Sequence, residues 1–134
     1  MIVAAQLTSN QQKVLEALRN ARAPLSAYGI LERLQESSIR APLQVYRALE
    51  KLIDRGLVHR LESLNAFIVC DHQGDHSRHP VAFAICDACG GVEEFVDPSV
   101  EKGLSRWSKG HAFEAKRVTV ELRGLCESCN GVPK

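Results

Sequence analysis

Two pairs of cysteines constrain this chain most strongly: Cys86-Asp87-Ala88-Cys89 and Cys126-Glu127-Ser128-Cys129. Each pair places two sulfur ligands on one tight turn, and two such turns supply the four thiolates of a tetrahedral zinc cage. The 36 residues between the pairs exceed the spacing of an ordinary zinc ribbon. We therefore expect the cysteines to clamp a small domain shut rather than to fold a single finger. Two disulfides, or one redox-active pair, are the alternative interpretation.

The remaining composition favours the zinc cage over disulfides. The chain has 134 residues, of which 45% are hydrophobic and 25% charged, as in ordinary soluble proteins. Its apolar runs are shorter than the roughly 18–20 residues that span a bilayer. The first residues lack the basic start and apolar stretch of a signal peptide, so we expect a cytoplasmic protein, in which metal thiolates prevail.

The first half of the chain predicts a winged helix-turn-helix. Thr8 or Ser9 can cap a first helix, Ser26 a second, and Pro42 suits the first position of a third that ends near Gly56. Two short strands follow, at residues 57–61 and 66–70, joined by a turn at residues 62–65. In this fold the third helix enters the major groove of DNA.

Charge supports a nucleic-acid partner for this half. Residues 1–70 hold nine Lys or Arg against six Asp or Glu, whereas residues 71–134 hold eight against ten. Tyr46, Arg47 and Lys51 share the face of the third helix opposite its apolar residues, and Arg40 comes just before it. These side chains suit contacts with phosphates and base edges. A merely solvated charged face is the alternative.

The second half predicts a small α+β domain. Strands are expected at residues 81–85, 91–96 and 118–122, with a helix beginning at Pro98 and Ser99. We expect a winged-helix domain at residues 1–71, a hinge loop at 72–80, and a zinc-containing dimerisation domain at 81–134. About 60 residues make too small a core to be stable alone, so zinc, dimerisation or both must stabilise this domain.

A second set of metal ligands is possible outside the cage: His59, Cys70, His79 and Glu94. Two imidazoles, a thiolate and a carboxylate make a tetrahedral set that suits zinc. Bound there, a metal would connect the two domains. Isolated histidines on strands are more often structural. A catalytic zinc needs an open position, and these four ligands fill the site, so we do not expect an enzyme.

The order of five motifs resembles the ferric uptake regulator family, and most of all its zinc uptake branch. The motifs are Tyr46-Arg47-Ala48-Leu49, Gly56-Leu57-Val58-His59, Asn65-Ala66-Phe67-Ile68-Val69-Cys70, Ile85-Cys86-Asp87-Ala88-Cys89-Gly90 and Gly124-Leu125-Cys126-Glu127-Ser128-Cys129. The resemblance implies a dimeric, metal-responsive transcriptional repressor that binds a palindromic operator and represses zinc-uptake genes. It assigns the structural zinc to the four paired cysteines and the sensing zinc to His59, Cys70, His79 and Glu94, which makes two zinc ions per protomer.

The resemblance also implies DNA contacts from Tyr28 and Arg47, with Tyr46 as an additional contact. The chain departs from the iron and peroxide sensors of the family, because Pro80-Val81-Ala82-Phe83 stands where they carry a His-His-Asp-His run. Gln44 replaces a usual threonine, and a leading helix found in many relatives is expected to be missing. An iron-, manganese- or peroxide-responsive regulator remains the alternative within the family. A thiol redox sensor is the alternative outside it.

Overall fold

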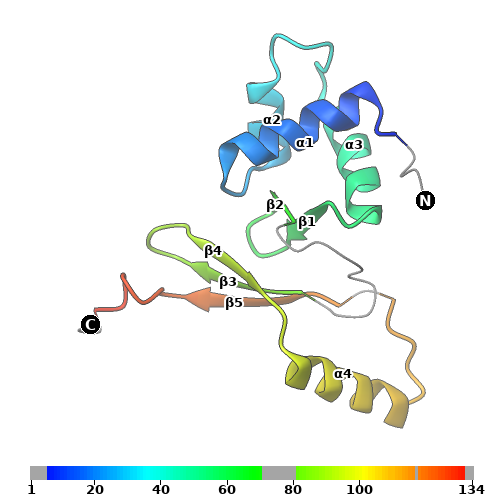
Figure 1. Cartoon of the computed structure of the whole chain (residues 1–134), viewed down its shortest axis with the longest axis vertical. Helices are drawn as coiled ribbons and strands as arrows, with labels where there is room; N and C mark the ends of the chain where they lie inside the picture. The colour runs from blue at the N-terminus through cyan, green and yellow to red at the C-terminus, as the bar shows by residue number, and fades with distance from the viewer. Residues whose placement is uncertain (1–5, 71–80, 117, 132–134) are drawn as a thin grey trace. The chain divides into compact units, whose positions relative to one another are not determined.

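A computed structural model of the chain describes residues 6–70, 81–116 and 118–131 (Figure 1). The chain divides into two compact units, Met1–His72 and Gln73–Lys134. The predicted hinge, residues 72–80, lies outside the described residues, so the predicted domain bounds stay predictions. Within the described ranges, no helix combines the length and the hydropathy that a bilayer span requires.

The first unit contains three helices and a hairpin, as the sequence predicts. The helices are α1 (Ser9–Ala21), α2 (Ala27–Arg33) and α3 (Pro42–Asp54). Strands β1 (Val58–Leu61) and β2 (Ala66–Val69) pair antiparallel. Thr8 caps α1 and Ser26 caps α2, each by accepting a backbone N–H, and Gly56 follows α3 with a φ of 74°.

The core of this unit forms where the apolar stripes of the three helices meet the hairpin. Val14 and Leu18 of α1, Ile30 of α2 and Val45 of α3 are at most 1% exposed. Phe67 of β2 joins the same cluster, and its backbone exchanges two hydrogen bonds with Leu25, of 2.8 and 2.9 Å. The core therefore fixes α3 from one side and leaves its opposite side exposed.

The described residues of the second unit form a three-stranded sheet and one helix. Strands β3 (Ala82–Cys86), β4 (Val92–Phe95) and β5 (Val120–Gly124) are ordered β4-β3-β5. The central strand β3 pairs antiparallel with β4 and parallel with β5. Helix α4 (Pro98–Gly110) begins at the N-cap Asp97, whose carboxylate accepts the Ser99 N–H at 2.8 Å, and connects β4 to β5. The predicted α+β architecture is confirmed.

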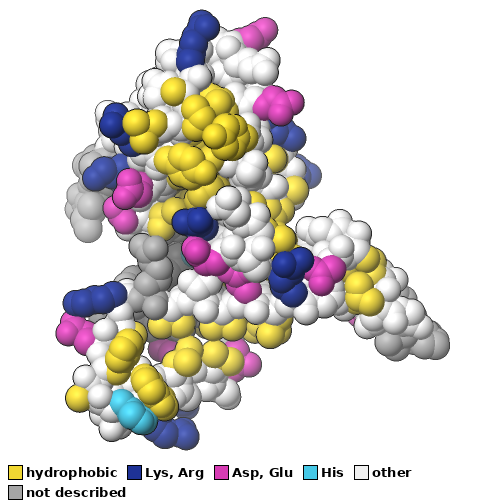
Figure 2. Space-filling view, turned by 180° about the vertical axis from the view of Figure 1, so that it is seen from behind, with side chains coloured by type: hydrophobic (Ala, Val, Ile, Leu, Met, Phe, Trp, Pro, Cys, Tyr) yellow, Lys and Arg dark blue, Asp and Glu magenta, His cyan; other side chains and the backbone are white. Residues whose placement is uncertain are grey.

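This second unit exposes much apolar surface. Helix α4 buries none of its residues, and Figure 2 shows hydrophobic side chains gathered on the helix and on the nearby sheet. Trp107 is 54% exposed and stacks on His111, with ring centroids 4.3 Å apart. The other exposed large apolar residues of the unit are Val96, Val100, Leu104, Phe113, Val118, Leu122 and Leu125. Exposed apolar side chains in such number on one small unit are typical of a protein–protein interface.

Candidate metal centre and nucleic-acid interface

The two cysteine pairs form two matching turns. Strand β3 ends at Cys86, whose carbonyl accepts the Gly90 N–H at 3.0 Å, and Gly90 adopts a φ of 77°. In the second turn the Cys126 carbonyl accepts the Asn130 N–H at 2.9 Å, and Gly131 has a φ of 76°. Each positive φ lets the chain leave the turn at once, a conformation that glycine adopts without strain.

The sulfur atoms of Cys86, Cys89, Cys126 and Cys129 all lie within 4.8 Å of one another. The Cys89 and Cys126 sulfurs are 3.9 Å apart, far beyond the roughly 2.05 Å of a disulfide bond. Four sulfurs at about 2.3 Å from one zinc ion would be spaced by about 3.8 Å. The separation therefore fits a shared metal, and all four cysteines are free rather than joined in disulfides.

Backbone amides surround the sulfurs. The Cys86 Sγ accepts N–H bonds from Cys89 and from Cys126, both at 3.4 Å, and Cys89 Sγ accepts one from Gly91 at 3.4 Å. The Cys89 amide, with the Cys126 amide, lowers the pKa of Cys86 to about 6, because both bonds stabilise the thiolate. The backbone amides therefore favour the thiolate form of this cysteine, the form that binds metal.

The pKa of Cys129 is shifted in the opposite direction. Hydrogen bonding to the Cys126 side chain, followed by that to Cys86, raises the pKa of Cys129 to about 12. Several thiolates cannot share so small a volume unless a cation neutralises them. A divalent ion that prefers sulfur would remove this penalty, so the donor set fits zinc.

The sheet holds the two turns together. Cys86 is paired with Gly124 in the parallel ladder of β3 and β5, and the Asp87 N–H donates to the Gly124 carbonyl at 2.7 Å. The Arg123 guanidinium contacts the Asp87 carboxylate at 2.7 and 2.9 Å. This ion pair was not predicted from the sequence, because its two residues are 36 positions apart and neither motif points to the other.

The second predicted ligand set is divided among three parts of the chain. His59 lies on β1 and Cys70 directly follows β2, so the hairpin brings both into the first unit, where their ligand atoms lie within 4.8 Å. Glu94 lies on β4 of the second unit, opposite Phe83 in the ladder. His79 lies outside the described residues. The four-ligand site therefore stays a prediction.

The exposed face of α3 carries the predicted DNA-contacting residues. Arg47 and Lys51 are exposed, whereas Val45, Leu49 and Leu52 are buried beneath them. Tyr46 is 40% exposed, and its ring meets Phe67 edge-on at a centroid distance of 6.4 Å, so this contact orients the phenol. The face thus combines cationic, aromatic and hydrogen-bonding groups.

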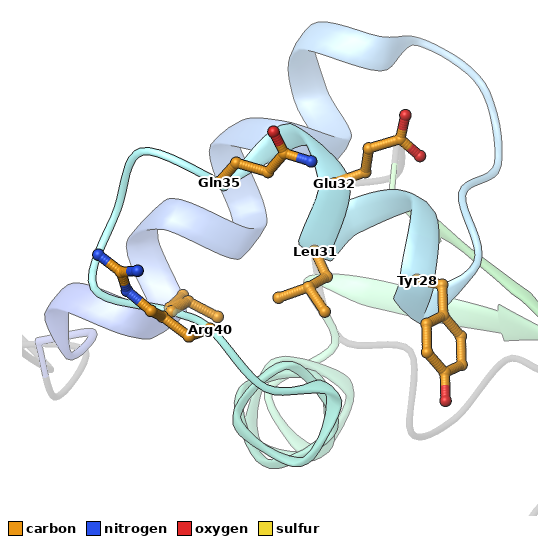
Figure 3. Close-up of a pocket in the computed structure, with 6 residues that line it drawn as sticks. Tyr28, Leu31, Glu32, Gln35 and Arg40 are labelled. Atoms are coloured by element: carbon orange, nitrogen blue, oxygen red, sulfur yellow. The ribbon is translucent and has the colours of Figure 1, made fainter.

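Two further candidates flank a groove between α2 and the segment that leads into α3. Tyr28 and Arg40 line this groove with Leu31, Glu32, Gln35 and Ile39. Figure 3 shows Tyr28 and Arg40 on opposite sides of Leu31. Tyr28 is 66% exposed, which leaves its hydroxyl accessible to a partner.

Gln44 stabilises the start of α3, a role that was not predicted from the sequence. Its side-chain Oε1 accepts the Arg40 N–H at 2.8 Å and the Ala41 N–H at 3.0 Å. These bonds satisfy two backbone donors just before α3, where the N-cap residue Ala41 makes no side-chain hydrogen bond. A glutamine at the third helical position was the available signal.

Comparison with known proteins identifies the family of the chain. Residues 3–123 match the ferric uptake regulator family. The chain belongs to the ferric uptake regulator family. The resemblance drawn from the five sequence motifs is thereby confirmed.

Several relatives within the ferric uptake regulator family are zinc uptake regulators. The chain is 35% identical to the zinc uptake regulation protein of Escherichia coli over 125 residues, which cover 92% of this chain and 72% of the relative. The structure of holo XcZur superposes with a TM-score of 0.84 at 37% identity, covering 96% of this chain and 89% of the other. A zinc uptake regulator complexed with zinc and DNA gives 0.83 at 33% identity, covering 92% and 82%. The family consists of transcriptional regulators, which agrees with the expectation that the protein is not an enzyme.

Proposed function

We propose that this chain is a zinc-responsive transcriptional repressor that acts as a homodimer in the cytoplasm. The observation that carries the proposal is the four-sulfur cage in a fold that closely resembles a zinc uptake regulator complexed with zinc and DNA. The exposed cationic face of α3 supports operator binding. The apolar surface of α4 supports a dimer, and a dimer with two-fold symmetry matches a palindromic operator.

Each protomer would bind two zinc ions. Cys86, Cys89, Cys126 and Cys129 would hold the structural ion, which links the two turns and stabilises a small core. His59, Cys70, His79 and Glu94 would hold the sensing ion, and the proximity of the His59 and Cys70 ligand atoms supports this assignment.

The sensing ligands come from both units and from the segment between them. Zinc would therefore favour a single arrangement of the DNA-binding units, in which the two α3 helices match the spacing of the operator half-sites. Coupling of about 1–3 kcal/mol would raise DNA affinity about 5- to 150-fold. Occupancy of the operator would then block transcription of zinc-uptake genes. DNA contacts are proposed for Tyr28, Arg40, Tyr46 and Arg47.

The test is binding of a labelled palindromic operator while free zinc is varied in a metal buffer, with ferrous and manganous ions in parallel. We expect tight binding with zinc alone, at trace free concentration. A stronger response to iron or manganese would favour the other sensors of the family. DNA binding that answers to oxidant and ignores all three metals would favour the redox sensor.

A further inference from the structure

One exposed leucine lies at the start of the helix proposed to enter the major groove. Leu43 is the second residue of α3 and is 57% exposed, whereas Val45, Leu49 and Leu52 of the same helix are buried. Single exposed leucines are common on protein surfaces, so exposure alone assigns no function. The neighbours of Leu43 on its helix face make the difference.

Leu43 lies on the same face as the proposed DNA contacts. Tyr46 and Arg47 follow it by three and four residues, which places all three side chains together on the helix surface. The first turn of α3 contains no acidic residue, and the carboxylates of this face come later, at Glu50 and Asp54. The N-terminal end of the face is therefore the part that can approach DNA most closely without charge repulsion, and it is the end that contacts base edges in helix-turn-helix proteins.

Gln44, the next residue, is not available for the usual glutamine–adenine contact. That contact is bidentate and needs both the amide oxygen and the amide nitrogen of the side chain. In this structure the Gln44 Oε1 already accepts the N–H groups of Arg40 and Ala41. Pro42 has no polar side-chain atom. Leu43 is thus the exposed apolar side chain of the first turn, and it can approach a base edge.

We propose that Leu43 contacts the C5-methyl group of a thymine in each operator half-site and so helps to determine operator sequence. The methyl group of thymine is the one apolar feature that base pairs present in the major groove. An exposed aliphatic side chain that lacks donors and acceptors complements that group and none of the polar ones. This inference rests on the proposed DNA-binding function.

The experiment uses the zinc-loaded full chain and an operator duplex selected from a random palindromic library. Each thymine is replaced in turn by deoxyuridine, which removes the methyl group and keeps every hydrogen-bonding atom. We expect one symmetric pair of positions at which affinity falls about fourfold per half-site, or about 15-fold for both, the value of one buried methyl group.

Variants connect that loss to Leu43. Leu43→Ala should bind the thymine and deoxyuridine duplexes equally, while Leu43→Met should keep the discrimination. Leu64→Ala, which truncates another exposed leucine, is the matched control and should also keep it. Thermal unfolding of all three variants and the parent chain is the folding control, and each variant is compared at a temperature at which it is folded.

The inference is overturned if the parent chain binds both kinds of duplex equally, or if Leu43→Ala still discriminates between them. Either result leaves zinc-dependent operator binding intact. A failure to select any duplex in the presence of zinc is a different outcome. It would overturn the proposed function, and this inference with it.

Discussion

Arg47 lies near the middle of the exposed face of α3, beside Tyr46 and on the side opposite the buried Val45. We predict that Arg47→Ala weakens operator binding by about 1–3 kcal/mol, or roughly 5- to 150-fold, because a guanidinium contact to a base or phosphate is lost. Fluorescence anisotropy with zinc present measures the affinity. Arg19→Ala, which removes an exposed arginine from α1, should change it little, and zinc content should be unaltered in both variants. Equal affinity of the Arg47→Ala variant and the parent chain would remove Arg47 from the interface.

Cys70 tests the sensing site at the same scale. We predict that Cys70→Ser abolishes the zinc dependence of operator binding, because a hydroxyl is a poor replacement for a thiolate ligand. The fold should persist, since the residue lies outside the core cluster and its backbone N–H still reaches the Leu57 carbonyl at 2.8 Å. The test is the operator affinity of this variant measured across a range of free zinc, with circular dichroism as the folding control. A normal zinc response of this variant would refute the sensing assignment.

Individual ligands were predictable from the sequence wherever their chemistry is unusual. Paired cysteines at short spacing have few structural uses, so all four cage residues could be identified from the sequence alone. Gln44 and Leu43 could not, because glutamine and leucine are common and their significance depends on exposure and on which backbone donors lie nearby. Asp87 and Arg123 form an ion pair across 36 residues, which no local pattern reveals.

At the scale of elements, the side chain of Gln44, the third residue of α3, stabilises the N-terminus of that helix. We predict that Gln44→Ala lowers the free energy of unfolding of the first unit by about 1 kcal/mol, because two backbone donors lose their acceptor. Thermal unfolding monitored by circular dichroism measures this change. Gln12→Ala, an exposed glutamine in α1, is the matched control and should be nearly neutral or slightly stabilising. Equal stability of the two variants would contradict the capping assignment.

The elements themselves were largely predictable. Thr8, Ser26 and Pro42 begin their helices as local chemistry dictates, and alternating apolar residues identify β5. Boundaries shifted by a residue or two: β3 begins at Ala82, and β5 at Val120. The order β4-β3-β5 was not predicted, because pairing between strands that are distant in sequence depends on the whole domain and not on either strand alone.

At the scale of the whole molecule, the cage makes the stability of the two units separable. We predict that a strong chelator, or Cys86→Ser, unfolds the second unit and leaves the first one folded, because the first has its own core of buried residues from all three helices. Hydrogen exchange read by mass spectrometry should show lost protection over residues 81–131 and retained protection over 6–70. Cys70→Ser, which spares the cage, is the control. Full protection of residues 81–131 in Cys86→Ser would mean that the cage is not structural.

The position of the cage at the end of the parallel β3–β5 ladder has a consequence for how the chain folds. Strand alignment can slip by two residues and keep the same side chains on each face, and such a slip displaces one strand by about 6.6 Å. That distance exceeds the roughly 3.8 Å between sulfurs around one zinc ion, so a misaligned sheet cannot bring both cysteine pairs to the metal. The observed pairing of Cys86 with Gly124 is the alignment in which the four sulfurs lie close enough to share one metal ion. Metal capture at the cage would thus favour the aligned sheet over a slipped one.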